Sequence, residues 1–284
     1  RPRNSASRVC LVSLGCAKNQ VDSEQVLGRL AASGALICAD PRDADTLIIN
    51  TCGFIAPAIE ESIGTIHEAA RLKQRGTCRR LVVMGCLVQR HGSRLRRELP
   101  DVDAFVGVGD VEAVLRACGV RPRGTPGVRL RFGLPHVAYL RIADGCDNRC
   151  AYCTIPIIRG PFRSRPEKKI LAEARDLTAD GARELVLVAQ DTTSYGRDLP
   201  GASLPRLIEK LQRRCGDAWL RLMYTHPAHF GDDLIEAFRS APALCSYVDL
   251  PLQHLADPIL KRMGRRVTQA RILGLIDKLR DRIP

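Results

Sequence analysis

Three cysteines within eight residues constrain this chain more than any other feature. Cys146, Cys150 and Cys153 follow a strand-like segment, residues 138–143, at Cys-x3-Cys-x2-Cys spacing. The group is too compact for an ordinary disulfide framework, but its thiols can all face one metal centre. Three thiolates fill three corners of a cubane iron–sulfur cluster, which normally takes four cysteines. One iron is then open to a small-molecule ligand, so the loop predicts a reactive cluster.

A structural zinc site is the alternative interpretation of this loop. Zinc in such sites takes four protein ligands. No fourth cysteine or histidine lies close to the three thiols, and the nearest is His136. The ligand count therefore favours an iron–sulfur cluster over zinc.

The N-terminal part of the chain alternates strand and helix patterns. Segments 8–14, 46–50 and 80–84 are apolar and β-branched, and segments 22–32 and 60–73 carry a helical periodicity. Strands that alternate with helices over short connections form a parallel sheet. We therefore expect an α/β domain with an open parallel sheet.

A glycine adjoins a cysteine at the end of each of these three strands. The cysteines are Cys16, Cys52 and Cys86. Ligands of open α/β sheets bind outside the carboxyl ends of the strands, and glycine lets the backbone approach a bulky group. These thiols predict a second cluster with three protein ligands. The alternative is that they are buried small apolar residues. We expect that role for the six cysteines without this context: Cys10, Cys38, Cys78, Cys118, Cys215 and Cys245.

The C-terminal half repeats the strand–helix pattern and predicts a barrel. A further strand (102–108) and a short helix (111–118) complete the first domain, which we expect to span residues 1–120. Residues 121–135, rich in Gly, Pro and Arg, are expected to form a linker, and residues 136–284 the second domain. After the cysteine loop we expect strands at 184–189, 219–224 and 247–250, and helices at 168–180, 204–215, 232–239 and 269–280. About four βα units with polar strand ends indicate a partial (βα) barrel whose site lies on one face.

By the same rule, five polar residues at strand ends are expected to face the loop. They are Gln190, Asp191, Thr225, His226 and His254. His226 and His254 can equally be capping or structural groups. No side chain is put forward as a catalytic acid or base.

Composition bounds the setting of the protein. The 44 Lys and Arg exceed the 31 Asp and Glu, and the net charge of +13 favours a polyanionic neighbour such as RNA or the ribosome, although Arg-rich chains also exist without one. Twelve cysteines in 284 residues are too few for a disulfide scaffold, so we expect a reducing, cytoplasmic setting. No apolar run approaches the roughly 18 residues of a membrane span, and no signal peptide is visible. The first residue is not Met, which suggests a fragment.

The motifs together resemble the radical S-adenosylmethionine (SAM) methylthiotransferases over essentially the whole chain. The cysteine loop with Tyr152 before its last thiol looks like the radical SAM signature. Within that family, residues 15–24 (GCAKNQVDSE) and 190–192 (QDT) are similar to the RimO type and differ from the tRNA-modifying MiaB type. Residues 153–160 and 251–254 also fit.

The resemblance implies a set of cofactors and site residues. Two 4Fe-4S clusters would be held by the two cysteine trios, and SAM would bind the open iron of the Cys146 loop. Tyr152 would lie near the adenine, and Gln190, Asp191 and His254 would help to bind the cofactor. The two trios would have to face one shared cavity. Family members carry two further barrel units and a TRAM domain, so the chain is expected to be truncated.

The resemblance also implies an activity and partners. The activity would be the addition of a methylthio group to the β-carbon of an aspartate in the small-subunit ribosomal protein numbered twelve, free or in the assembled subunit. An electron donor such as flavodoxin or ferredoxin would be needed. The positive charge of the protein would allow contacts with RNA, and no membrane partner is expected. The alternatives are a tRNA adenosine methylthiotransferase of the MiaB type and a non-catalytic iron–sulfur protein that binds RNA.

Overall fold

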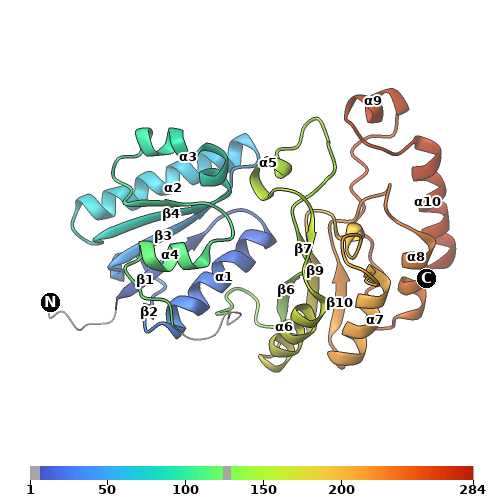
Figure 1. The fold of residues 1–284 in the computed structure, drawn as a ribbon, viewed down its shortest axis with the longest axis horizontal. Helices are drawn as coiled ribbons and strands as arrows, with labels where there is room; N and C mark the ends of the chain where they lie inside the picture. Colours follow the sequence, from blue (N-terminus) through green and yellow to red (C-terminus); the bar gives the residue numbers. More distant parts are fainter. Residues whose placement is uncertain (1–6, 124–128, 284) are drawn as a thin grey trace. The chain divides into compact units, whose positions relative to one another are not determined.

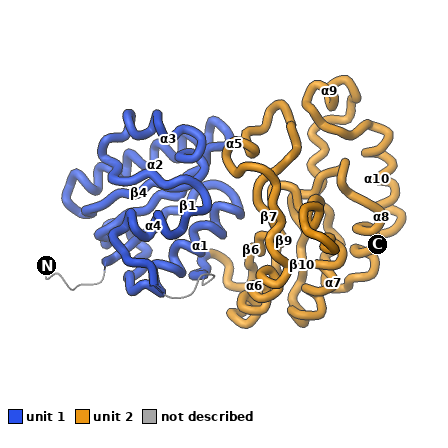
Figure 2. The backbone as a smooth tube through the Cα atoms, viewed as in Figure 1, with its two compact units in different colours: residues 1–132 blue, residues 133–284 orange. Residues whose placement is uncertain are grey.

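The computed structural model describes residues 7–123 and 129–283. The chain divides into two compact units, residues 1–132 and 133–284, each with its own hydrophobic core (Figure 2). Among the described helices, none combines the length and the apolar content needed to span a lipid bilayer.

The first unit is built on a five-stranded parallel sheet (Figure 1). Its strand order is β2-β1-β3-β4-β5. The strands are β1 (Arg8–Ser13), β2 (Leu36–Ile37), β3 (Thr46–Thr51), β4 (Arg80–Gly85) and β5 (Ala104–Val106). β1, β3 and β4 are neighbours, so their carboxyl ends lie side by side.

Helices cover both faces of this sheet, which explains the continuous apolar runs of its strands. The helices are α1 (Ala17–Ala32), α2 (Ala56–Gln74), α3 (Cys86–Glu98) and α4 (Val111–Ala117). Leu47 and Ile49 of β3 pack in a cluster with Ile66 of α2, whereas Ile48 points the other way and packs in a cluster with Leu30 of α1. The expected α/β class with an open parallel sheet is confirmed.

Two helices begin earlier than their periodicity predicts, and α3 was not expected. α1 starts at Ala17 instead of residue 22 because its first turns bury polar residues, Lys18 and Asn19, which carry no apolar signal. α2 starts at Ala56 instead of residue 60. α3 starts at Cys86 itself and is basic along most of its exposed length.

The second unit contains a three-stranded parallel sheet of order β10-β9-β6. Its strands are β6 (Val137–Arg141), β9 (Glu184–Val188) and β10 (Trp219–Leu222), and a short antiparallel pair is formed by β7 (Ala143–Asp144) and β8 (Arg163–Ser164). The helices are α5 (Ile155–Arg159), α6 (Glu167–Ala179), α7 (Leu204–Arg214), α8 (Asp232–Ser240), α9 (Asp257–Arg262) and α10 (Gln269–Arg282). Leu140, Leu187 and Leu222 of the three strands lie in its core.

The strand expected at residues 247–250 is not formed. Just before this segment, the chain pairs with β10 through a single parallel bridge, between Leu244 and Leu220. The amide of Tyr247 then donates to the carbonyl of Cys245 at 2.7 Å, an i→i+2 turn that breaks the strand. Beyond the turn, the side chain and carbonyl of Asp249 accept hydrogen bonds from the end of β10 at Tyr224 and Thr225.

Candidate metal centres

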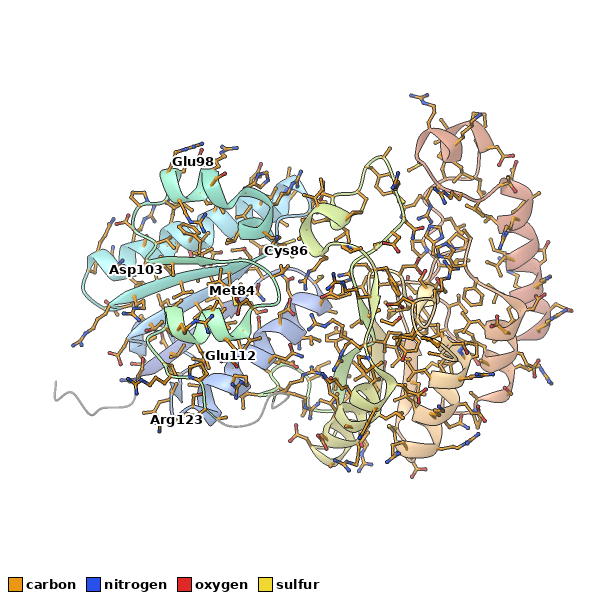
Figure 3. The ribbon with its side chains drawn as sticks, viewed as in Figure 1. Met84, Cys86, Glu98, Asp103, Glu112 and Arg123 are labelled. Carbon is orange, nitrogen blue, oxygen red and sulfur yellow. The ribbon has the colours of Figure 1, made fainter. Side chains whose placement is uncertain are left out.

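The three N-terminal cysteines of the predicted cluster lie at the carboxyl ends of three neighbouring strands. Cys16 is the N-cap of α1 after β1, Cys52 follows β3, and Cys86 opens α3 directly after β4. Cys86 lies just beyond Met84 at the end of its strand (Figure 3). Cys16 is exposed, Cys52 is half-buried and Cys86 is buried. The parallel sheet therefore delivers all three thiols to one edge of the first unit.

Glycines allow the strand-end loops to approach one another. Gly15 has φ +90°, and a Cβ at this position would lie 3.0 Å from Cβ of Cys52 and 3.4 Å from its sulfur. A Cβ at Gly53 would lie 2.8 Å from the carbonyl oxygen of Cys86. The first loop thus contacts the second, and the second contacts the third, as the expected convergence requires.

Asn19 links all three strand ends and was not singled out from the sequence. Its Nδ2 donates to the carbonyls of Leu14 and Thr51, at 3.0 Å each, and its Oδ1 accepts from the thiol of Cys86 at 3.4 Å. Asn50 donates from its side chain to the Asn19 carbonyl at 2.9 Å. The available signal was the six polar residues among positions 18–24, in a helix that covers an apolar sheet.

The cysteine loop of the second unit is closed at its base by the segment that follows α5. Gly145 has φ +75°, and a Cβ there would lie 2.0 Å from the carbonyl oxygen of Pro161. The amide of Cys146 donates to the Gly160 carbonyl at 3.2 Å, and the Asp147 carboxylate accepts from the Phe162 amide at 3.0 Å. A residue with a Cβ would clash at position 145, so this loop geometry requires glycine there.

The turn after α9 supports the other side of the loop. The amide of Ala151 donates to the carbonyl of Met263 at 2.9 Å. Gly264, with φ +69°, lies so close that a Cβ would be 2.6 Å from the Arg149 carbonyl. Residues more than 100 positions apart in the sequence therefore fix the path of this loop.

The donor set of each trio suits an iron–sulfur cluster. Burial raises the pKa of the thiols of Cys146 and Cys153, so each favours the neutral form until a bound metal withdraws the proton. Among the described residues, no three His, Cys, Asp or Glu side chains converge closely enough to hold one metal ion. A cubane places its irons at separate corners, so its ligands surround it and need not meet at one point.

The strand-end residues expected near the cofactor have well-defined partners. Gln190 donates to Asp144 at 2.9 Å, while its buried Oε1 has no partner among the described residues. Asp191 is 2 % exposed and accepts from the Asn148 side chain of the cysteine loop at 2.8 Å. Tyr152 is 46 % exposed. Burial of its hydroxyl raises its pKa to about 12, although the nearby charge of Arg265 acts to lower it.

The two histidines singled out from the sequence each accept a backbone hydrogen bond. His254 is exposed, and its Nδ1 accepts from the Ala256 amide at 2.9 Å. His226 is buried, accepts from the Ala228 amide at 3.2 Å and stacks on His229. Burial and the charge of Arg265 lower the pKa of His226 to about 4. Thr225 donates to the Asp249 carbonyl.

Arg265 is a buried cation that sequence reasoning missed. It is 7 % exposed and donates from one terminal nitrogen to the Pro251 carbonyl at 2.6 Å, but its Nε has no acceptor and no carboxylate pairs with it among the described residues. Its charge acts on both Tyr152 and His226, so it lies near the cysteine loop and the end of β10. A buried cation is normally paired, so this position suits an anionic ligand.

Comparisons with known proteins identify the class of the chain. Residues 140–284 match the model of the Radical SAM superfamily, and residues 8–107 match "Uncharacterized protein family UPF0004". In fold, 98% of the chain aligns with 66% of the radical SAM methyltransferase TsrM from Kitasatospora setae at TM-score 0.68 and 14% identity. The cobalamin-dependent radical enzyme OxsB aligns at TM-score 0.64 and 10% identity, over 96% of this chain and 48% of that one. The fold and the three-cysteine loop define the radical SAM class.

Similar proteins of known name show which family within the radical SAM class the chain belongs to. The "Ribosomal protein uS12 methylthiotransferase RimO" of Geobacter sulfurreducens is 50% identical over 99% of this chain and 66% of its own length. That of Elusimicrobium minutum is 42% identical over 98% of this chain and 67% of its own length. The chain belongs to the RimO family of ribosomal protein uS12 methylthiotransferases. It spans about two thirds of the length of these relatives.

Proposed function

We propose that this chain is the cofactor-binding part of an enzyme that adds a methylthio group to the β-carbon of an aspartate in ribosomal protein uS12. The observation that carries the proposal is the pair of three-cysteine sites, one at a strand-end edge and one in a loop held by hydrogen bonds on both sides. The family of the chain supports the substrate, because its relatives are named for uS12.

Each cysteine trio would hold one 4Fe-4S cluster. The loop cysteines, Cys146, Cys150 and Cys153, leave one iron open for SAM, whereas Cys16, Cys52 and Cys86 would hold the second cluster. When bound, these groups would supply radical chemistry, which breaks an unactivated C–H bond that acid–base groups cannot break. The protein would supply the position of the reacting groups.

The residues around the loop suit the amino-acid portion of SAM. The Nε of Arg265 and the Oε1 of Gln190 have no partner within residues 7–123 and 129–283. The first is a donor for a carboxylate, and the second is an acceptor for an ammonium group. Tyr152 offers an aromatic face beside the last loop cysteine. These assignments are part of the proposal.

The proposal requires further partners. An electron donor such as flavodoxin or ferredoxin would reduce the loop cluster, and a cytoplasmic location would give access to ribosomal subunits. The net charge of +13 also favours RNA contacts and is the observation behind the second candidate, a tRNA adenosine methylthiotransferase. A non-catalytic iron–sulfur protein that binds RNA is the third.

One experiment separates these candidates. The reconstituted full-length protein is incubated with SAM, a reductant and either small ribosomal subunits or tRNA, and both are analysed by mass spectrometry. A methylthio mass increment on the uS12 aspartate is expected. An increment on tRNA alone supports the second candidate, and reconstituted protein that modifies neither substrate supports the third.

Two alanine variants test the division of labour between the trios. Cys150→Ala should abolish reductive cleavage of SAM, because the loop cluster loses a ligand. Cys52→Ala should leave cleavage intact and stop formation of the methylthio product. Cys215→Ala, at a buried cysteine of the second core, is the control and should retain both activities. Product made by Cys52→Ala would contradict the second cluster site.

A further inference from the structure

Asn148 touches both a loop cysteine and a buried carboxylate. Its Nδ2 lies 3.4 Å from the sulfur of Cys146 and 2.8 Å from Oδ2 of Asp191. An amide nitrogen carries two hydrogens, so it can donate to both acceptors at once. Asn148 therefore connects the predicted cluster ligand to the end of β9.

Asp191 is held by protein donors on both of its oxygens. Oδ1 accepts from Thr193 Oγ1 at 2.6 Å, and Oδ2 accepts from Ser194 Oγ at 2.9 Å and lies 2.8 Å from Nδ1 of His229. Burial alone would raise the pKa of Asp191, but hydrogen bonds from His229, Thr193 and Ser194 outweigh it and hold the pKa well below its usual range. The group is an ionised, fixed carboxylate.

An ionised carboxylate can only accept hydrogen bonds, and this fixes the orientation of Asn148. The amide nitrogen must face Asp191, so the second N–H of the same nitrogen faces Cys146 Sγ. A flipped amide would direct its oxygen toward the carboxylate and toward the sulfur of Cys146, which would be a thiolate when it holds a cluster, and both contacts would then be repulsive. The sequence places these two residues 43 positions apart, so only the fold reveals the pairing.

We infer that Asn148 and Asp191 are positioning residues that hold an N–H against the Cys146 sulfur and thereby raise the reduction potential of the loop cluster. The inference rests on the proposed function only in requiring a cluster at Cys146, Cys150 and Cys153. Hydrogen bonds to cluster sulfurs, and the groups that orient their donors, tune the potential, because an N–H donor stabilises the extra negative charge of the reduced state. Asp191 acts through Asn148 and is not a cofactor ligand in this assignment.

The test is an EPR-monitored redox titration of reconstituted full-length protein. A background with Cys16, Cys52 and Cys86 all changed to alanine leaves the loop cluster alone. Asn148→Leu keeps the approximate size of the side chain and removes the N–H donor. We expect the equilibrium constant for reduction to fall about tenfold, which is 59 mV for one electron. An unchanged potential would overturn the inference.

Asp147→Ala is the matched control on the same loop. It removes the hydrogen bond to the Phe162 amide without touching a sulfur. Removal of the Asp147 carboxylate takes a negative charge away from the loop, so its potential should equal or exceed that of the parent and should not fall. Iron content and thermal unfolding show whether the loop remains intact. A fall of the same size in Asp147→Ala and Asn148→Leu would mean that loop distortion, and not the N–H, sets the potential.

A double-mutant cycle tests the role of Asp191. In the Asp191→Asn background the amide orientation is no longer enforced, so Asn148→Leu should change the potential by much less than in the parent. Additive effects would show that Asp191 does not act through Asn148. A parent protein that assembles no cluster at the loop would instead contradict the proposed function, so the two failures are distinguishable.

Discussion

At the residue scale, single side chains decide which ligands the second unit can accept. Arg265 is buried, carries a full charge and has an Nε without an acceptor among the described residues. An unpaired buried charge is costly, so a bound carboxylate would stabilise this position.

We predict that Arg265→Gln weakens binding of S-adenosylhomocysteine, which has a carboxylate, by about tenfold or more, the equivalent of one charged hydrogen bond. Binding of 5′-methylthioadenosine, which lacks the amino-acid portion, should change little. Equilibrium dialysis of the reconstituted protein measures both. Arg266→Gln, an exposed neighbour, is the control. Equal losses for both ligands would argue against a carboxylate contact.

Gly145 and Gly160 offer a second residue-scale test, because both have positive φ but only Gly145 is sterically confined. Gly145→Ala adds a Cβ 2.0 Å from the Pro161 carbonyl, so the loop must open. We expect loss of the loop cluster, seen as about four fewer irons per chain. Gly160→Ala meets no atom within 4 Å and should retain its iron. Equal iron loss in both variants would point to the backbone conformation instead.

At the element scale, the strand ends of the first unit depend on the first turns of α1. Asn19 is 1 % exposed and bonds the ends of β1 and β3 as well as Cys86. Through Asn19, the first turn of this helix therefore holds the ends of three parallel strands together at one edge of the sheet.

We predict that Asn19→Ala lowers the free energy of unfolding by about 2–4 kcal/mol, because a buried and a part-buried backbone carbonyl lose their donor. It should also reduce iron at the first trio and spare the loop cluster. Urea unfolding and iron analysis measure these effects. The control is Gln20→Ala, at a partly exposed position whose side chain bonds Glu24 and the Phe132 carbonyl. Normal stability of Asn19→Ala would show that the strand ends do not need these hydrogen bonds.

The sequence predicted most elements, and two of the exceptions have causes visible in the structure. Strands 46–50 and 80–84 and helices 168–180 and 204–215 agree with β3, β4, α6 and α7 to within one residue at each end. The start of α1 was missed because polar residues are buried there. The strand at 247–250 was wrong because the turn at Tyr247 and the contacts of Asp249 override an apolar pattern.

At the scale of the whole molecule, the chain carries two units with separate cores, and each contributes one cysteine trio. We predict about eight irons per reconstituted chain, and about four after all three cysteines of either trio are changed to alanine. Iron and zinc analysis of the anaerobic protein checks this. One zinc per chain in place of iron would contradict both cluster assignments.

The sequence by itself determined the α/β class and singled out the loop cysteines and the strand-end cysteines as predicted cluster ligands. These inferences depend only on local spacing and on where strands end. The tertiary structure alone decided the pairing of Asn148 with Asp191, the hydrogen bonds of Asn19 to the strand ends and the burial of Arg265 away from any carboxylate of the described residues. Such contacts join residues far apart in the chain, and no local pattern encodes them. Their geometry depends on how helices and strands pack, which side-chain periodicity does not specify.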